Sequence, residues 1–138
     1  MNNIVRWEKY SPVGIGLEDM FKRLDAFADT TSSNYPPYNI VKLDDDKQQL
    51  QIALAGWSRD EIEVSVERNV LNVNTNQIHV DDDEYIHKGI ASRSFSRNWQ
   101  LSEDTKVGEV KYLNGMLFIT LCKEIPDEHK RQVLSIAE

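Results

Sequence analysis

Three histidines and one cysteine are the side chains of this sequence best suited to metal or nucleophilic chemistry. His79 and His87 flank an acidic loop, and His129 lies near the C-terminus. None of them forms an H-x-x-x-H or C-x-x-C pattern, which a metal site built on one element would need. Cys122 ends an apolar run with no acid-base partner nearby, so we interpret it as a small packed residue.

Two runs of carboxylates, at residues 44–46 and 81–84, suggest cation binding at first sight. A calcium loop, however, alternates its acidic ligands and adds a turn glycine and a closing glutamate. Consecutive carboxylates instead indicate a turn or a solvated loop tip. Gly14-Ile15-Gly16 lacks the lysine and hydroxyl residue of a phosphate-binding loop. We therefore expect no metal, no cofactor and no enzyme activity.

The composition excludes several classes of partner. The chain has 138 residues and a formal net charge of −7, which argues against binding to nucleic acid. No apolar run approaches the roughly 18 residues that span a bilayer. The first residues lack the pattern of a secretory signal, and a single cysteine forms no intramolecular disulfide. We expect a cytoplasmic protein without membrane or nucleic-acid partners.

Patterning divides the chain into an N-terminal arm at 1–34, a domain at 35–122 and a C-terminal extension at 123–138. In the arm, apolar residues from Leu17 to Ala28 recur with helical spacing, which predicts an amphipathic helix. In the domain, Ile62, Val64 and Val66 alternate with polar residues, as strands do. Seven or eight such strands, separated by turns about every 8–12 residues, predict an all-β, immunoglobulin-like antiparallel β-sandwich.

Two turn signals are local and specific. Arg68-Asn69 and Asn114-Gly115 both fall between apolar alternating runs, and asparagine and glycine tolerate the positive φ of hairpin turns. We expect a tight hairpin at each.

The C-terminal extension ends in a short adhesive pattern. Leu134 and Ile136 point to one side of an extended chain, with Ser135 on the other. Such a segment either docks into an apolar groove as an added strand or forms the last strand of its own domain. Twelve mostly polar residues separate it from Leu121, which favours a tether.

Five stretches in this order resemble the small heat-shock proteins, which carry the α-crystallin domain, and above all their bacterial inclusion-body-binding members. They are residues 35–40, 52–64, 85–91, 93–97 and 113–117. The tail motif of the family is usually Ile/Val-x-Ile/Val, whereas this chain has Leu134-Ser135-Ile136. Because leucine is not β-branched, we expect a looser fit in the groove.

The resemblance implies a β-sandwich with a helical or flexible N-terminal arm and a flexible C-terminal tail. It also implies an ATP-independent holdase that binds unfolding proteins as dimers assembled into larger homo-oligomers. Residues 85–90 would lie beside the partner's residues 39–41, with Arg97 at the interface arginine of the family. The interface residues implied in this way are Ile40, Val41, Tyr85, Ile86, Lys88 and Arg97.

Two further surfaces follow from this interpretation. We predict that Val64, Val66, Val110 and Tyr112 line the groove that receives Leu134 and Ile136. The apolar arm is predicted to bind clients, since methionine and aromatic side chains suit promiscuous contact. Its residues are Trp7, Leu17, Met20, Phe21, Leu24 and Phe27. Packing of this face inside the oligomer is the alternative, and the two can alternate in time. Whether the arm or the domain holds the main client site stays open.

Other functions stay open at this point. The same sandwich occurs in co-chaperone-like modules that bind a partner protein without assembling, but those lack the tail motif. A carbohydrate-binding module would need aromatic platforms, and Trp57 and Trp99 are the only tryptophans of the domain. A paralogue or an ATP-dependent refolding chaperone also stays open as a further partner.

Overall fold

The computed structural model describes residues 15–30, 34–78, 81–90 and 93–138. The chain forms two compact units, residues 1–34 and residues 35–138, and each is described by itself. In the first unit, helix α1 spans Glu18–Thr30, and its first turn carries Glu18 and Asp19 beside the positive end of the helix dipole. The predicted amphipathic helix is confirmed. Neither α1, with 13 residues, nor any shorter helical turn described could cross a bilayer.

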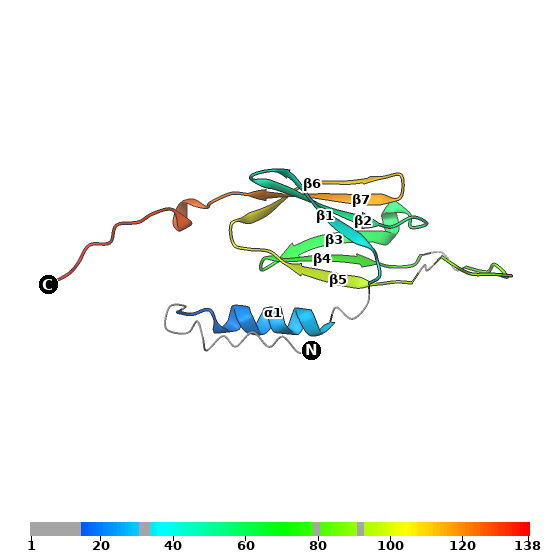
Figure 1. Cartoon of the computed structure of the whole chain (residues 1–138), viewed down its shortest axis with the longest axis horizontal. Helices are drawn as coiled ribbons and strands as arrows, with labels where there is room; N and C mark the ends of the chain where they lie inside the picture. Colours follow the sequence, from blue (N-terminus) through cyan, green and yellow to red (C-terminus); the bar gives the residue numbers. More distant parts are fainter. Residues whose placement is uncertain (1–14, 31–33, 79–80, 91–92) are drawn as a thin grey trace. The chain divides into compact units, whose positions relative to one another are not determined.

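The second unit is built from strands. The described strands are β1 (Tyr38–Asp44), β2 (Lys47–Ala53), β3 (Ile62–Glu67), β4 (Val70–Thr75), β5 (Ser96–Gln100), β6 (Thr105–Leu113) and β7 (Met116–Lys123). They form two antiparallel sheets with the strand orders β1-β2-β7-β6 and β3-β4-β5. The two sheets lie over one another as layers (Figure 1). The predicted all-β sandwich is confirmed.

Both predicted hairpin turns are present. Arg68 and Asn69 have φ values of 50° and 62°, and Asn114 and Gly115 have 51° and 76°. Two successive residues with positive φ make the turn whose twist matches antiparallel strands. At Gly115 a side chain is also excluded by space, because a Cβ atom there would lie 3.1 Å from Ala55.

The core lies between the sheets and follows the period of two along the central strands. Each of β2, β4 and β7 turns alternate apolar side chains inward. The buried side chains are Leu50, Ile52, Leu54, Trp57, Leu71, Val73, Leu101, Leu117 and Ile119. Burial of each is worth about 1.5–3 kcal/mol, so this layer supplies the main stabilisation of the sandwich.

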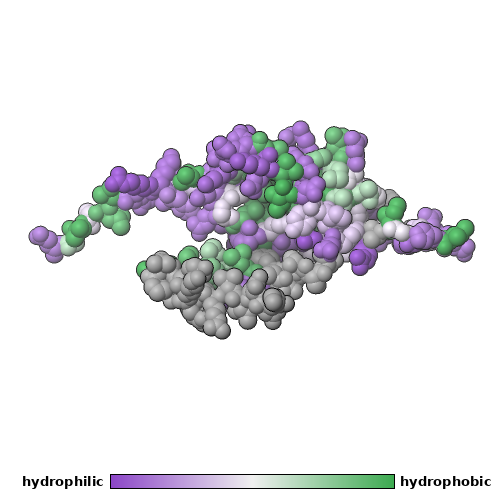
Figure 2. All heavy atoms as spheres, viewed as in Figure 1, coloured by the Kyte–Doolittle hydropathy of each residue, from purple (hydrophilic) through white to green (hydrophobic). Residues whose placement is uncertain are grey.

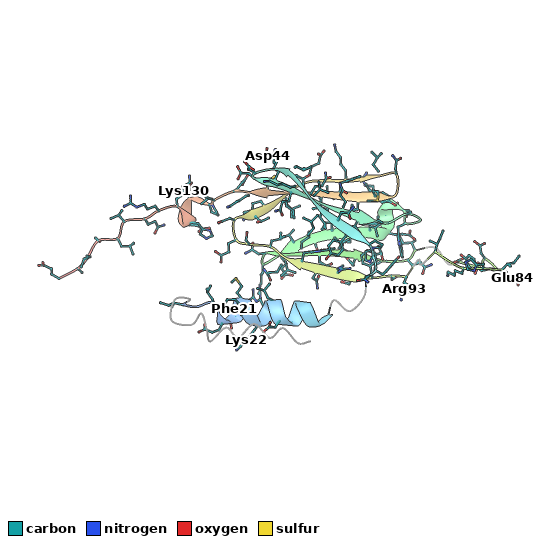
Figure 3. All side chains as sticks on the ribbon, viewed as in Figure 1. Phe21, Lys22, Asp44, Glu84, Arg93 and Lys130 are labelled. Carbon is teal, nitrogen blue, oxygen red and sulfur yellow. The ribbon has the colours of Figure 1, made fainter. Side chains whose placement is uncertain are left out.

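The strand expected at residues 85–90 is not formed within this chain. The described residues 81–90 carry no strand, and this loop extends away from both sheets (Figure 1). Glu84 lies at its far end and Arg93 lies where the chain returns to the domain (Figure 3). A strand needs a neighbour for its backbone hydrogen bonds, and this loop has none in its own chain among the described residues.

The C-terminal extension is not a further strand of the domain. After β7 comes a 3₁₀ turn, η3, at Asp127–His129. Residues 131–138 have no regular secondary structure and extend beyond the sheets (Figure 1). Of the two alternatives left by the sequence, the structure favours the tether.

Candidate functional site

An open groove of about 790 Å³ lies between β3 and β6, the edge strands of the two sheets. All four side chains predicted to line a groove line this one: Val64, Val66, Val110 and Tyr112. Ile62, Val107 and Leu117 add apolar surface, and Arg59 and Lys111 also contribute to the lining.

The groove leaves apolar surface in contact with water. Val66 is 49% exposed and Val110 is 42% exposed, although both belong to regular strands. The register of β6 against β7 shifts between Val107 and Val110, as at a β-bulge. The shift accounts for two valines three residues apart lining the same groove, which strict alternation would forbid. Exposed apolar side chains gathered in this way are typical of a docking site.

Tyr112 is held at the groove by the turn that follows β2. Its hydroxyl lies 2.8 Å from the carbonyl oxygen of Leu54 and 2.6 Å from that of Trp57. Burial raises the pKa of Tyr112, and the nearby Glu61 carboxylate adds to the shift. The phenol therefore stays neutral and acts as a hydrogen-bond donor.

Glu61 is a buried carboxylate that the sequence analysis did not single out. Its side chain accepts hydrogen bonds from the backbone N–H groups of Ser58 and Ile78, both at 3.0 Å. It closes the 3₁₀ turn η2 (Arg59–Glu61), which leads into β3. The signal was readable, because Ser58-x-x-Glu61 is a capping-box pattern.

The tail motif lies in water. Leu134 is 79% exposed and Ile136 is 93% exposed. Neither lines the groove of its own chain. Figure 2 shows hydrophobic residues near the end of the extended tail, between hydrophilic ones. The structure thus places the groove and the motif on one chain without bringing them together.

The side chains predicted to bind the partner are mostly accessible. Ile40 on edge strand β1 is 58% exposed, and Ile86 in the loop is fully exposed. Val41 is half-buried, and Tyr85 and Lys88 are exposed. Figure 2 also shows a hydrophobic cluster at the end of the extended loop.

The loop is held in shape by contacts of its own. The hydroxyl of Tyr85 donates to Asp81, and the Lys88 ammonium lies 4.8 Å from the centre of the Tyr85 ring. The hydrogen bond from Tyr85 is the main cause that lowers the pKa of Asp81, with the Asp83 N–H next. A hollow of about 880 Å³ separates this loop from residues near Trp57.

Arg97 contacts its own chain. Its guanidinium lies 4.4 Å from the centre of the Tyr38 ring and 5.7 Å from that of Trp99. One of its amino groups donates to the carbonyl oxygen of Pro36 at 3.4 Å. The side chain is half-buried at the edge where β5 faces the beginning of β1. A role at the partner interface would come in addition to this contact.

The predicted client-binding side chains are described only in part. Leu17, Met20 and Leu24 are 38%, 44% and 43% exposed, and Phe21 is half-buried. Trp7 and the side chain of Phe27 lie outside the described residues.

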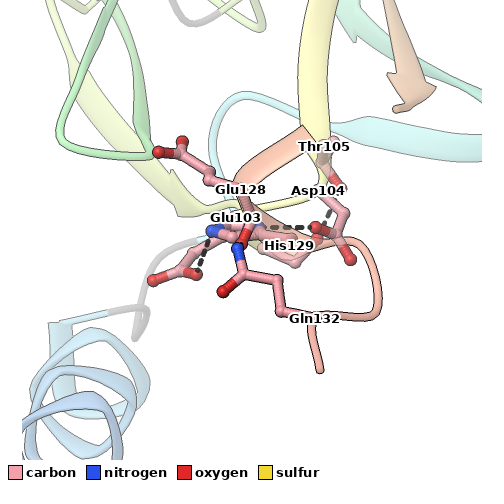
Figure 4. A network of polar contacts seen from close by, with 7 residues as sticks. Glu103, Asp104, Thr105, Glu128, His129 and Gln132 are labelled. Carbon is pink, nitrogen blue, oxygen red and sulfur yellow. Dashed lines mark hydrogen bonds and ion pairs between the residues drawn. The ribbon is translucent and has the colours of Figure 1, made fainter. Parts of the chain in front are cut away.

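The root of the tail carries a polar cluster that the sequence did not predict. Figure 4 shows His129 between the carboxylates of Glu103 and Asp104, which belong to the turn between β5 and β6. No local signal could have revealed it, since the partners are separated by 25 residues or more. Within the described ranges, no three histidine, cysteine or acidic residues form a group fit to hold a metal ion.

Comparisons with known proteins agree on one family. Residues 40–137 match the model of the Hsp20/alpha crystallin family. The small heat shock protein HspD of Bradyrhizobium diazoefficiens is 37% identical over 122 residues, which are 88% of this chain and 81% of that protein. The small heat shock protein IbpA of Escherichia coli is 33% identical over 125 residues, covering 88% and 90%.

Solved structures show the same similarity. The small heat shock protein of Synechococcus phage S-ShM2 has a TM-score of 0.59 and 47% identity, covering 74% of this chain and 99% of that one. A C-terminally truncated form of the small heat shock protein AgsA of Salmonella typhimurium has a TM-score of 0.61 and 26% identity, covering 73% and 98%.

Proposed function

This chain belongs to the Hsp20/alpha-crystallin family of small heat-shock proteins, and from that premise we propose that it is an ATP-independent holdase. It binds unfolding proteins and prevents their aggregation, without catalysing a reaction. It works in the cytoplasm as dimers that assemble into larger homo-oligomers.

One observation carries the assembly. The same chain presents an apolar groove between β3 and β6 and an exposed motif that does not fill it. Leu134 and Ile136 have the spacing of alternate residues on an added strand, and Val66 and Val110 are the exposed valines of the groove. We assign the tail of one subunit to the groove of a neighbouring subunit.

Dimers form, in this proposal, through the loop at residues 81–90. Its exposed Ile86 has no apolar cover in its own chain among the described residues, and edge strand β1 presents an equally exposed Ile40. Pairing of residues 85–90 with the partner's residues 39–41 supplies the neighbouring strand that the loop lacks. The contacts of Tyr85 with Asp81 and Lys88 restrict the loop before it pairs with the partner, which lowers the entropy cost of pairing.

The weakness of one tail contact makes the assembly dynamic. Burial of Leu134 and Ile136 contributes on the order of 1.5–3 kcal/mol each. Association entropy of roughly 4–15 kcal/mol opposes the docking of a single tail. Two tails on each dimer raise the effective concentration and close a shell that still exchanges subunits. Heating opens such a shell and exposes apolar surface to clients.

The arm is the assigned client surface. Met20 and Leu24 on α1, with Leu17 directly before it, present a partly exposed apolar face. Flexible methionine and apolar side chains accommodate many unfolded sequences. The net charge of −7 keeps an adhesive particle of this kind in solution.

The test is aggregation of a heat-labile enzyme, followed by light scattering without ATP. We expect scattering to be suppressed at near-stoichiometric ratios, and ATP to add nothing. Unchanged scattering by a folded chain that runs as a small species on a sizing column would contradict the proposal. It would favour a co-chaperone-like module that binds one partner protein.

A further inference from the structure

Both ring nitrogens of His129 face a carboxylate. The Nδ1 atom lies 3.1 Å from Oδ1 of Asp104, and the Nε2 atom lies 3.3 Å from Oε2 of Glu103 (Figure 4). Ionised carboxylates only accept hydrogen bonds, and a neutral imidazole has a single N–H. The Nδ1 contact is a hydrogen bond and the Nε2 contact is an ion pair, so the doubly protonated, positively charged ring is the form that both contacts favour.

The backbone around His129 is folded against the same turn. The N–H of Glu124 donates to the carbonyl oxygen of Asp104 at 2.7 Å. His129 itself ends the turn η3, where its N–H donates to the carbonyl oxygen of Pro126 at 2.9 Å. Lys130 pairs with Asp127 at 2.7 Å within that turn. The tail is thus anchored at Glu124 and His129. Beyond them, the side chain of Gln132 donates to the carbonyl oxygen of Glu128 at 3.2 Å.

Carboxylates dominate the surroundings of the imidazole. Glu103 and Asp104 face it from the turn between β5 and β6, and Glu128 is the charged neighbour in its own turn. The hydrogen bond with Asp104 is the main cause that raises the pKa of His129. Burial, the next largest cause, lowers this pKa, and the charges of Glu103, Asp104 and Glu128 raise it further.

We propose that His129 is a positioning residue that pins the root of the tail to the turn between β5 and β6 when its ring is protonated. This pin rests on the function proposed above for Leu134 and Ile136, since its consequence is where their motif can dock. It makes the assembly of this chain sensitive to pH.

The sign of the effect follows from the direction of the shift. The folded-state pKa of His129 is raised above its ordinary value of about 6.5, so the pin is complete below that value. It is lost as the pH rises through the folded-state pKa. The tail is therefore anchored at low pH and released at high pH.

The pin sets the reach of the motif. Leu134 is the fifth residue after His129 but the tenth after Glu124, the other anchor. A fully extended chain covers about 17 Å over five residues and about 34 Å over ten. A pinned tail therefore reaches only nearby grooves, which favours one assembly geometry. A released tail reaches several, which favours a broader set of sizes.

The pin itself is tested on the full chain carrying Leu134→Gly and Ile136→Gly, in which no motif docks. An NMR titration should place the pKa of His129 above 6.5, and Asp104→Asn should lower it. Backbone relaxation at residues 131–133 should show greater mobility at pH 8 than at pH 6. A pKa at or below 6.5, or one that Asp104→Asn leaves unchanged, would overturn the proposal.

The consequence for assembly is tested by sedimentation velocity of the chain with its motif intact. We expect a broader size distribution at pH 8 than at pH 6. His129→Gln should be broad at both pH values, and His129→Lys, which keeps its charge, should be narrow at both. If the unsubstituted chain and both variants respond to pH alike, His129 does not position the tail. A failure of tail docking itself gives a different result. The chain with Leu134→Gly and Ile136→Gly would then still form the large species, while the titration would still show a raised pKa of His129.

Discussion

The guanidinium of Arg97 lies 4.4 Å from the centre of the Tyr38 ring and so joins β5 of one sheet to β1 of the other. The Trp99 ring packs edge-on against Tyr38, with 5.5 Å between the ring centres. These three side chains close one edge of the sandwich. The opposite edge, between β3 and β6, carries the open groove. The two edges of the sandwich thus differ: side chains from both sheets close one of them, and a groove stays open at the other.

Replacing Arg97 by lysine should weaken the closed edge. The ammonium keeps the charge but cannot stack its plane on two rings, so we expect a loss of about 0.5–2 kcal/mol in the free energy of unfolding. Urea denaturation measures this loss, with Arg131→Lys in the exposed tail as the matched control. An unchanged urea midpoint, combined with weaker dimerisation, would show that Arg97 acts only at the partner interface.

The tail variant Leu134→Gly with Ile136→Gly should remain a dimer. Both side chains are almost fully exposed in the single chain, so the substitutions leave folding intact and remove only the docking contact. Sedimentation velocity should show loss of the large species. Val133→Gly with Ser135→Gly changes the other side of the same extended segment and should still assemble. A large species that survives the first pair of substitutions would disprove tail docking.

Ile86→Ser should separate the dimer without unfolding the domain. The side chain is fully exposed in one chain, and its burial at a partner surface is worth about 1.5–3 kcal/mol. We expect the dissociation constant of the dimer to rise at least about tenfold. Analytical ultracentrifugation of the tail variant measures it, with Glu84→Ser in the same loop as control. If both substitutions raise the dissociation constant equally, burial of the Ile86 side chain is not what holds the dimer together.

Deletion of residues 2–34 should abolish suppression of aggregation. The sandwich has its own core, so its urea midpoint should change little, and the circular dichroism should lose only the contribution of α1. Light scattering from a heat-labile enzyme gives the readout. If the shortened chain still protects the enzyme, the main client site lies on the domain and the assignment of the arm is wrong.

Local patterns were sufficient to predict most of the sandwich. Alternation in β2, β4 and β7 and the two hairpin turns each depend on neighbouring residues, and each is confirmed. The groove was predictable because Val64, Val66, Val110 and Tyr112 lie on edge strands of the fold that the resemblance implied. The fold and the protein family were both predictable from the five stretches that carry the resemblance.

Contacts between distant residues were not predictable in this way. Arg97 meets Tyr38 and Pro36 across about 60 positions, and His129 meets Asp104 across 25. Each depends on how a turn or an edge is placed by the whole fold, and no periodicity encodes it. Residues 85–90 carry no strand in the single chain, and their pairing with the partner's residues 39–41, which the resemblance implied, stays a prediction.

Cysteine cross-linking between two populations of the chain tests the tail-in-groove contact most directly. Both carry Cys122→Ser; one also carries Val110→Cys, and the other carries Ile136→Cys and a tag that changes its mass. Disulfides form only between Cα atoms closer than about 7 Å. After subunit exchange and mild oxidation we predict a mixed, cross-linked pair with the mass of one tagged and one untagged chain. Ser135→Cys in place of Ile136→Cys should give much less of it. Absence of the mixed pair under conditions where the large oligomers form would contradict the account.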